Sequence, residues 1–421
     1  MKVLWFTNTP SLYAAGEHSY KGGGWIESLE RELRKEKDIE LGIAFLSKDD
    51  AREKHVENVK YFPLNSRQNS IMKLISRYRV RIENQNVNKN IIQLVNDFKP
   101  DLIHVFGTEG VFASLVVDLN VPVVIHLQGL ITPYVNAFFP NSISIFSLIF
   151  NKYLLFDNLL GRGLYFQYLQ MKKQAKREQY FLSRSKHIAG RTAWDKMISN
   201  LYACNASYYF IDEVLRPVFY YDHILNTPED RLVIVTTISN TVYKGLDMIL
   251  KTADLIMKHL DVKFVWKVIG IRGEEKMVRF FEKHLDINSS NVSIEYCGVL
   301  NENSLVEVLK NCSLFIHPSY IDNSPNSICE AQMMGLPVIA CNAGGVGSLI
   351  EDRVTGYLVP TNAPHNIVSL VKEYSISSSE FILVGKKAKM IAEKRHDKNK
   401  IISATVSLYR KLFNDNNRFS Y

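Results

Sequence analysis

Two carboxylates in the last third of the chain are spaced so that they could act as an acid and a base or bind a ligand together. In IDNSPNSICEA, residues 321–331, Asp322 and Glu330 are eight positions apart and a Ser-Pro-Asn-Ser turn lies between them. An acid and a base that hydrolyse a glycosidic bond must flank it with their carboxyl groups ~5–10 Å apart and admit water. The other interpretation is that the two side chains hold a ligand whose reaction takes place beside them.

The turn between the two carboxylates favours the second interpretation. Ser324 is a plausible N-cap, Pro325 suits the first helical turn, and NSICEAQMM then continues as a helix. The free N–H groups at such a helix start attract an anion such as a diphosphate, and Glu330, about one turn further on, could accept hydrogen bonds from neighbouring sugar hydroxyls. These N–H groups belong to Asn326, Ser327 and Ile328.

Two further candidates lie in the first half of the chain. His126 ends the apolar run VPVVIHL, and parallel sheets bind ligands at the carboxyl ends of their strands. A lone histidine is nevertheless more often a structural residue. The glycines in YKGGGWIESL, residues 20–29, open a helix and would let the backbone approach a ligand closely.

Short apolar runs alternate with longer amphipathic runs, which is typical of βαβ units and parallel sheets. We therefore expect an α/β protein. A chain of 421 residues exceeds what one hydrophobic core organises, so we expect two doubly wound domains that meet near Pro217. Glu213 and Arg216, beside this boundary, are expected to form an ion pair between the domains. The expected strands are residues 3–6, 102–106, 121–127 and 187–190 in the first half, and 232–237, 264–270, 292–298, 314–319 and 337–341 in the second.

Residues 317–360 resemble the C-terminal signature of the retaining GT-B glycosyltransferases of glycosyltransferase family 4. The resemblance implies the GT-B architecture, two Rossmann-like domains facing a central cleft. It implies an acceptor-binding domain at 1–217, a domain for the nucleotide sugar at 218–395, and a C-terminal helix at 396–421 that packs back towards the first. The matching residues are Pro318, Ser319, Glu330, Ala331, Gly335, Pro337, Val338, Gly344, Gly345, Thr355, Gly356, Leu358 and Val359.

The resemblance also implies roles for single residues. Glu330 would hold the ribose of the nucleotide and Asp322 the donor sugar, although the usual residue at position 322 is the longer glutamate. TISNTVYKG is similar to the Lys-Gly element of the family, so Lys244, followed by Gly245, would neutralise the donor diphosphate. The family usually has an arginine at position 239 and an acidic residue at position 348, whereas this chain has serine at both.

The same resemblance assigns the first-half candidates. Gly23 and Gly24 match the glycine pair that lies against the donor and the acceptor, and His126 would lie near the reacting sugar. The expected catalytic residues are therefore His126, Lys244, Asp322 and Glu330. The expected donor-binding residues are Gly23, Gly24, Lys244, Gly245, Asp322, Ser324, Asn326, Ser327, Ile328 and Glu330.

The implied activity is transfer of a hexosyl unit, with retention, from a nucleoside-diphosphate sugar to a saccharide or lipid-linked saccharide, as in bacterial surface polysaccharide assembly. No metal or other cofactor is expected, because the sequence has no Asp-x-Asp element and no His/Cys ligand cluster. No nucleic acid partner is expected. Two alternatives stay open: a nucleotide-sugar epimerase of the same architecture, and a sugar-nucleotide binder with weak catalysis.

The net charge of +8 is concentrated in the first half. Residues 60–89 and 152–191 together hold sixteen basic residues against three acidic ones. Polar residues interrupt the aromatic segment 138–181, so it cannot span a bilayer, but with the basic residues it could lie on an anionic membrane surface. The five cysteines form no CxxC pair and the N-terminus lacks the apolar core of a signal peptide. We therefore expect a cytoplasmic protein, peripheral on the inner face of the membrane.

Overall fold

The computed structural model describes residues 1–14, 24–48, 51–67, 70–80, 85–119, 121–140, 143–223, 225–226 and 230–418. The chain divides into two compact units. The first comprises residues 1–135, 166–214 and 396–421, and the second comprises residues 136–165 and 215–395. The expected boundary stood at 217/218, whereas the chain divides at 214/215, and residues 136–165 belong to the second unit although the sequence analysis assigned them to the first domain.

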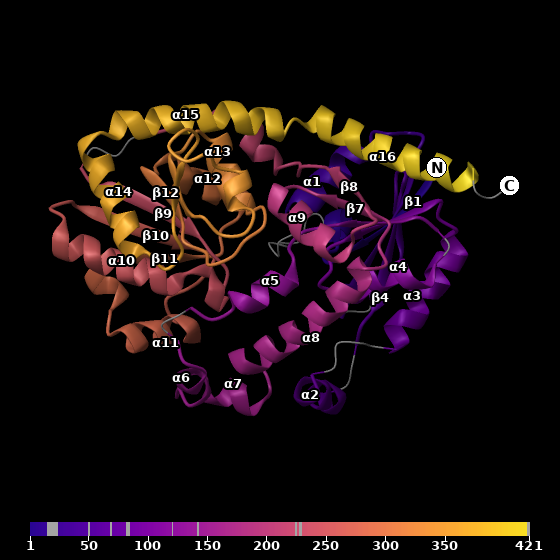
Figure 1. Ribbon diagram of the computed structural model, residues 1–421, viewed down its shortest axis with the longest axis horizontal. Helices are drawn as coiled ribbons and strands as arrows, with labels where there is room; N and C mark the ends of the chain where they lie inside the picture. The colour runs from indigo at the N-terminus through magenta and orange to yellow at the C-terminus, as the bar shows by residue number, and fades with distance from the viewer. Residues whose placement is uncertain are drawn as a thin grey trace. The chain divides into compact units, whose positions relative to one another are not determined.

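The described part of the first unit has an eight-stranded sheet in the order β3-β4-β2-β1-β5-β6-β7-β8, parallel except for the pair β3 and β4 (Figure 1). Its strands are β1 (Lys2–Thr7), β2 (Glu40–Ser47), β3 (Lys54–Val56), β4 (Val59–Asn65), β5 (Leu102–Phe106), β6 (Val123–His126), β7 (His187–Gly190) and β8 (Ser207–Phe210). Its helices are η1 (Ser11–Ala14), α1 (Gly24–Leu33), α2 (Ser70–Tyr78), α3 (Gln85–Phe98), η2 (Val111–Ser114), α4 (Leu115–Asp118), α5 (Ile131–Asn136), α8 (Leu164–Leu182), α9 (Ala193–Tyr202) and α16 (Lys398–Arg418).

The described part of the second unit has a six-stranded, fully parallel sheet in the order β11-β10-β9-β12-β13-β14. Its strands are β9 (Leu232–Thr237), β10 (Phe264–Ile269), β11 (Ile294–Gly298), β12 (Leu314–His317), β13 (Val338–Cys341) and β14 (Tyr357–Val359). Its helices are α6 (Ile145–Ile149), α7 (Leu155–Leu159), η3 (Pro217–Tyr220), η4 (Val242–Lys244), α10 (Leu246–His259), α11 (Lys276–Leu285), η5 (Ser289–Val292), α12 (Glu302–Lys310), α13 (Asn326–Met333), η6 (Val346–Ser348), α14 (Pro364–Ile376) and α15 (Ser378–Arg395).

The second sheet is covered on both faces, which explains its continuous apolar strands. Leu314 and Ile316 of β12 join a core made with α10, α11 and α14. Phe315, between them, joins the opposite core made with α12 and α13, because successive side chains of a strand point to opposite faces. Figure 1 shows the two groups of helices on the two sides of this sheet. A sheet buried in this way places its polar ligand-binding groups at the strand ends.

The C-terminal helix α16 is fixed to the sheet of the first unit by a buried tyrosine. The hydroxyl of Tyr409 accepts a hydrogen bond from Trp5 Nε1 at 3.0 Å and lies 2.6 Å from His104 Nδ1. Tyr409 is fully buried, and these two polar contacts offset the cost of burying its hydroxyl. The last helix of the chain is therefore part of the core that also contains the first strand.

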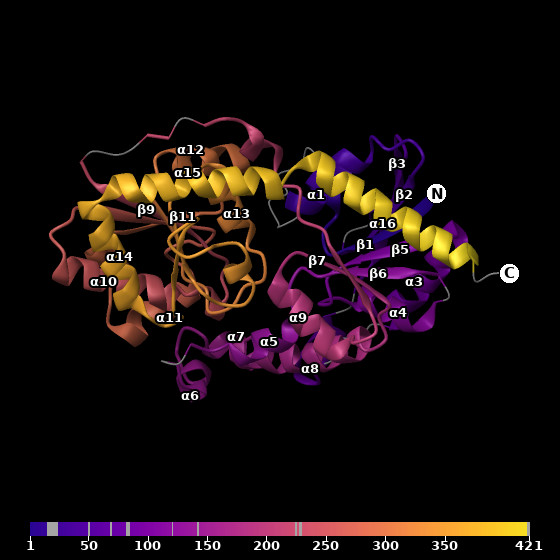
Figure 2. The same ribbon diagram turned by 45° about the horizontal axis from the view of Figure 1, so that its top comes forward.

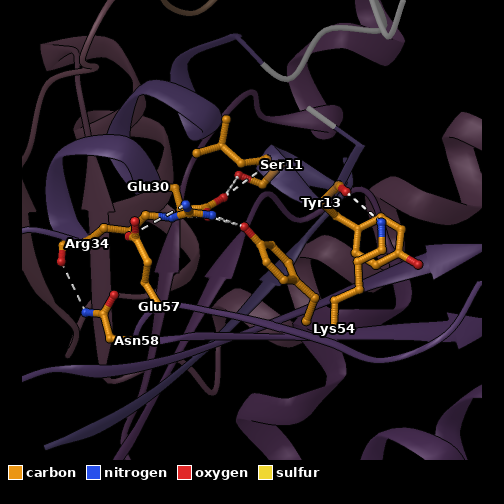
Figure 3. Close-up of polar contacts among 9 residues, drawn as sticks. Ser11, Tyr13, Glu30, Arg34, Lys54, Glu57 and Asn58 are labelled. Atoms are coloured by element: carbon orange, nitrogen blue, oxygen red, sulfur yellow. Dashed lines mark hydrogen bonds and ion pairs between the residues drawn. The ribbon is translucent and has the colours of Figure 1, made fainter. Parts of the chain in front are cut away.

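A fully buried carboxylate, Glu30, organises the opening segments of the first unit (Figure 3). It accepts hydrogen bonds from the Ser11 hydroxyl at 2.5 Å, the backbone N–H of Leu12 at 3.0 Å and Arg34 Nε at 2.9 Å. The hydroxyl of Tyr61 donates to the same carboxylate at 2.5 Å. Because a buried charge needs such partners, this network holds η1, α1 and β4 together.

The motif GRTAWDK has a structural explanation. Thr192 caps α9 by accepting from the backbone N–H of Asp195 at 3.0 Å, and the Asp195 carboxylate accepts from the Thr192 N–H at 3.3 Å. This reciprocal capping box satisfies two N–H groups that the first helical turn leaves open. The conspicuous residues of this motif therefore start a helix.

Among the described residues, no helix combines the length and the apolar character needed to cross a membrane.

Candidate functional site

The strand order of the second sheet reverses between β9 and β12, and parallel sheets bind ligands outside the carboxyl ends of their strands at such a point. Lys244 follows β9 and Asp322 follows β12. The Lys244 ammonium lies 2.5 Å from Asp322 Oδ2, and the two side chains are 20% and 12% exposed. The structure thus brings together two of the predicted catalytic residues as an ion pair at the expected edge of the sheet.

The position of Lys244 is fixed by the backbone around it. Gly245 has φ +81°, and a Cβ on it would stand 2.2 Å from the carbonyl oxygen of Pro318. The carbonyl of Tyr243 accepts a hydrogen bond from the N–H of Tyr320 at 2.8 Å. Only glycine combines this left-handed conformation with so close an approach. The Lys-Gly pair is therefore held directly against the chain that leads to Asp322.

Asp322 is held from three sides. Besides Lys244, the ring of His317 contacts it, with Nε2 3.3 Å from Oδ2. Its backbone carbonyl accepts from the N–H of Gly345 at 2.8 Å, and a Cβ on Gly344 would stand 2.1 Å from that carbonyl oxygen. The Gly-Gly pair of the signature is thus needed for a close packing of two loops, and His317 is a site residue that the sequence analysis did not identify.

The charges around Asp322 decide its ionisation. Burial alone would raise the pKa of this carboxyl, but the Lys244 ammonium and the contact with His317 hold it well below its ordinary value. Burial lowers the pKa of His317, and the Asp322 carboxylate opposes that shift. At neutral pH the site therefore contains a carboxylate, an ammonium and a neutral imidazole.

Helix α13 begins one residue later than expected. Pro325 is its N-cap and Asn326 its first residue, so Ser324 lies just before the cap. The N–H of Ile328 donates to the carbonyl of Pro325 at 3.0 Å, whereas no acceptor within the described chain takes the N–H groups of Asn326 and Ser327. The predicted set of open N–H groups is therefore reduced from three to two.

Glu330 lies inside α13 and is paired with Arg216. The guanidinium approaches Glu330 Oε1 at 2.9 Å through Nε and at 2.8 Å through Nη2. The side chains are 11% and 8% exposed, and the guanidinium carbon of Arg216 stacks 5.0 Å from the ring centre of Phe219. Within the second unit Arg216 contacts Glu330; the expected ion pair between Glu213 and Arg216 would join the two units and stays a prediction. The Glu213 carboxylate lies 3.3 Å from Arg191.

His126, in the first unit, lies at the carboxyl end of β6 as predicted and is fully buried. Its ring is parallel to that of His104 at 5.4 Å, and Trp25 meets it edge-on at 5.0 Å. Burial lowers the pKa of His126 well below its ordinary value, and the neighbouring His104 and Arg191 add to this effect. The imidazole is therefore neutral at physiological pH, within an aromatic cluster.

Of the predicted glycine pair, Gly24 is the first residue of α1 and Gly23 lies outside the described residues. The sheet of the first unit also has a reversal of strand order, between β1 and β5. Glu109 lies just beyond β5, and burial together with the nearby Glu178 carboxylate raises its pKa to about 7. The Glu109 carboxylate accepts a long hydrogen bond, 3.4 Å, from Asn8. The sequence analysis did not identify this carboxyl group.

The second unit is similar to known proteins. The family described as Glycosyl transferases group 1 matches residues 221–397. A putative colanic acid biosynthesis glycosyltransferase, WcaL of Escherichia coli strain K12, is 24% identical over 182 residues, which cover 42% of this chain and 43% of that protein. The chain thus matches less than half the length of this curated relative.

Solved structures match over nearly the whole chain. Sucrose-phosphate synthase from Thermosynechococcus elongatus superposes with a TM-score of 0.75 at 13% identity, covering 98% of this chain and 99% of that one. The Anabaena protein HepE, in complex with UDP and glucose, superposes with a TM-score of 0.66 at 14% identity, covering 98% and 100%. The two parallel sheets thus form the GT-B fold, and residues 221–397 are similar to the glycosyl transferases group 1.

Proposed function

We propose that this protein is a retaining glycosyltransferase that moves a hexosyl unit from a nucleoside-diphosphate sugar to a saccharide or lipid-linked saccharide in bacterial surface polysaccharide biosynthesis. The observation that carries the proposal is the edge of the second sheet, where Lys244, Asp322 and the start of α13 meet. The family match and the colanic acid relative support the reaction class. The complex of HepE with UDP and glucose supports a nucleotide-sugar donor.

The donor diphosphate would bind at the start of α13. The open N–H groups of Asn326 and Ser327 point from the positive end of the helix dipole, which favours an anion. The Lys244 ammonium has three N–H donors, so it can bind a phosphate oxygen while it keeps its contact with Asp322. Ser324 and Gly245 would lie beside the same group. No metal is part of this proposal, because the ammonium and the helix start supply the positive charge.

The two carboxylates would hold the hydroxyl groups of the donor. Glu330 would accept hydrogen bonds from the ribose and Asp322 from the sugar. Arg216 lies against Glu330 and brings a second cation to α13, in a chain that has serine at position 239. Because Glu330 is 8% exposed and already paired, ribose would have to share this carboxylate with the guanidinium. We propose that Arg216 positions Glu330.

Transfer would proceed on one face of the sugar. The bond from the anomeric carbon to the diphosphate breaks, the bond to the acceptor oxygen forms on the same face, and the acceptor proton passes to the departing phosphate. Lys244 and the α13 N–H groups stabilise the charge that grows on the leaving group. The reacting groups are also proposed to contact His126, Gly23 and Gly24. His126 would act as a neutral hydrogen-bonding group.

The alternatives have less support. The named matches are glycosyltransferases and synthases, which does not favour a nucleotide-sugar epimerase. A binder with weak catalysis would keep the Lys244 and Asp322 contacts but transfer no sugar. Incubation with radiolabelled UDP-, GDP- and ADP-sugars distinguishes the three functions, because only a transferase releases free nucleoside diphosphate in step with labelled glycoside.

The test begins with thermal shift, since a donor that binds only the folded protein raises its melting temperature. With the stabilising donor, Glu330→Ala should lose donor affinity by at least ~10-fold, the scale of a lost charge-assisted hydrogen bond. Glu373→Ala is the matched control, because Glu373 also pairs with an arginine, Arg353, at 2.8 Å but at the surface. Equal donor affinity and turnover in the two variants would refute the site.

A further inference from the structure

The second unit carries a cluster of large apolar side chains that its own core does not bury. Helices α6 and α7 come from residues 136–165, the segment that joins this unit from the first half of the chain. Phe146 and Phe150 are 75% and 74% exposed, and Phe156 and Leu159 are 65% and 64% exposed. We call these four residues the α6–α7 apolar patch. Figures 1 and 2 show the two helices beside one another, next to α11.

The opposite side of the same segment is firmly anchored. Ile143, Leu148, Leu154 and Leu164 are each less than 8% exposed and belong to the main core of the second unit. Helix α6 buries Leu148 and exposes Phe146, whereas α7 buries none of its own residues and is anchored by Leu154 before it and Leu164 after it. Phe146 and Phe150 are four residues apart and Phe156 and Leu159 three apart, so each pair lies on one side of its helix. The exposed side chains are therefore held in place by the buried ones.

Polar contacts fix the two helices to each other. The Asn158 side chain donates to the carbonyls of Leu148 and Ile149 at 2.9 and 3.0 Å, which binds α7 to the end of α6. A Cβ on Gly163 would stand 1.5 Å from Asn158 Oδ1, so only glycine at this position leaves space for the Asn158 side chain. The patch thus lies on two helices that hydrogen bonds hold together.

The charges near the patch are complementary to an anionic surface. Lys152 and Arg162 are exposed in the loops that follow α6 and α7. Asp157 is the only acidic residue between positions 143 and 165, and Lys276 of α11 neutralises it at 2.6 Å. Aromatic and aliphatic residues beside exposed cations are typical of protein surfaces that lie in the interface of anionic membranes.

We propose that the α6–α7 apolar patch inserts into the interfacial region of an anionic lipid bilayer, with Lys152 and Arg162 at its headgroups. The inference deepens the proposed function by naming the surface through which the enzyme reaches a lipid-linked acceptor, and its test needs no sugar transfer. It also narrows the sequence-based membrane hypothesis. That hypothesis used the aromatic and basic residues of the whole segment 138–181, whereas the patch comprises only residues in and next to α6 and α7.

The experiment is flotation of the full chain with vesicles of equimolar phosphatidylcholine and phosphatidylglycerol, and with phosphatidylcholine alone. The wild type should float with the anionic vesicles. A variant with serine at the four patch positions (Phe146→Ser, Phe150→Ser, Phe156→Ser, Leu159→Ser) should partition at least ~100-fold less, because each buried aromatic side chain contributes on the order of tenfold. Lys152→Gln with Arg162→Gln should lower anionic binding by about tenfold.

The control removes three other exposed apolar side chains of the second unit. Ile376, Leu383 and Met390 are 75%, 57% and 61% exposed, and their serine variant should float like the wild type. Thermal melting and donor-induced thermal shift of every variant check folding and the nucleotide site separately. A patch variant that keeps its donor shift but does not float supports the inference even if no transfer is found.

Three results would overturn the inference. One is equal flotation of the patch variant and the control variant. Another is a Phe150→Trp variant whose added emission stays at its aqueous wavelength in the presence of vesicles, because an inserted indole must shift to the blue. The third is a wild type that does not float but sediments as a dimer, with the patch variant a monomer, since the patch would then bind a second copy of the chain.

Discussion

The carboxyl edges of the two sheets differ in the side chains that lie there and in the charges of those side chains. At the edge of the second sheet, Lys244 pairs with Asp322, and Arg216 pairs with Glu330 within the adjoining helix. At the edge of the first, the rings of His126 and His104 stack in parallel and neither imidazole carries a charge near neutral pH. The edge of the second sheet thus holds an ion pair at each of its two predicted carboxylates, whereas the edge of the first combines neutral stacked rings with one buried ion pair, Arg191 and Glu213, 3.3 Å apart.

This difference indicates which ligand the second edge suits. Buried ion pairs cost desolvation energy and are weak evidence for stability alone, so their position at the strand ends favours a charged ligand such as a diphosphate. The first edge differs in that its neutral histidine rings lie beside one buried ion pair, Arg191 and Glu213. The proposed donor site of the second unit can therefore be tested one charge at a time.

The largest expected effect is that of removing the Lys244 charge. Lys244→Met should lower kcat/KM for sugar transfer by ~10³-fold, or about 4 kcal/mol, because the leaving diphosphate loses its cation. Lys251→Met is the matched control: Lys251 pairs with Asp247 at 3.0 Å and is 23% exposed, against 20% for Lys244. Steady-state kinetics of the two variants measure the difference. Similar kcat/KM values would show that the ion pair serves folding and not transfer.

The next effect concerns Arg216. Arg216→Gln should lower the free energy of unfolding by about 3 kcal/mol, because Glu330 would stay buried without its cation. Adding Glu330→Gln should restore most of the stability, but donor affinity should remain low, since the ribose acceptor is then lost. Urea unfolding and donor titration of both single variants and the double variant form the cycle. Donor affinity that recovers together with stability would contradict the assigned role of Glu330.

A smaller effect should follow the buried histidines of the first unit. Burial lowers the pKa of His104 to about 3 and holds that of His126 well below 6.5. The folded protein therefore stays unprotonated at these rings while the unfolded chain binds protons below about pH 6.5, so stability falls as the pH falls, by at most ~1.4 kcal/mol per pH unit for each ring.

This pH dependence can be assigned by substitution. His126→Phe should make the loss of stability between about pH 6.5 and about pH 5 shallower by one histidine. The wild type, which has both rings, gives the reference slope. Urea unfolding at a series of pH values measures both slopes. An unchanged slope in His126→Phe would mean that this ring is not buried and neutral as described.

The smallest effect is expected at the surface of the second unit. Arg353 and Glu373 form an ion pair at 2.8 Å, as close as that of Arg216 and Glu330, but their side chains are 60% and 36% exposed. Arg353→Gln should change the free energy of unfolding by less than about 1 kcal/mol, because water and salt screen the pair. A loss equal to that of Arg216→Gln would show that burial is not what distinguishes the two pairs.

The strands could be predicted from sequence where they are apolar on both sides. The runs 102–106 and 232–237 match β5 and β9, because central parallel strands consist of continuous apolar residues. Strands β2 and β4 were not predicted. The sequence of β4, VKYFPLN, contains a lysine and a proline, and its pairing depends on neighbours far along the chain. Local pattern alone does not indicate such strands.

The candidate site could be predicted only in part. Lys244 and Asp322 were identified from their motifs, and the structure places them in contact. His317 and Arg216 were not identified as site residues. Nothing near Arg216 in the sequence indicates that it contacts a residue 114 positions away. The pairing of Arg216 depends on the fold of the whole unit. Likewise, no local signal assigns residues 136–165 to the second unit.

The path of the chain restricts how this protein can be divided or recombined. The chain passes between the units after residues 135, 165, 214 and 395, so no single cut yields two complete units. A fragment starting at residue 215 would lack Ile143, Leu148, Leu154 and Leu164, which complete the core of the second unit. A chimera that exchanges the second unit for that of a relative must therefore carry residues 136–165 from the same parent.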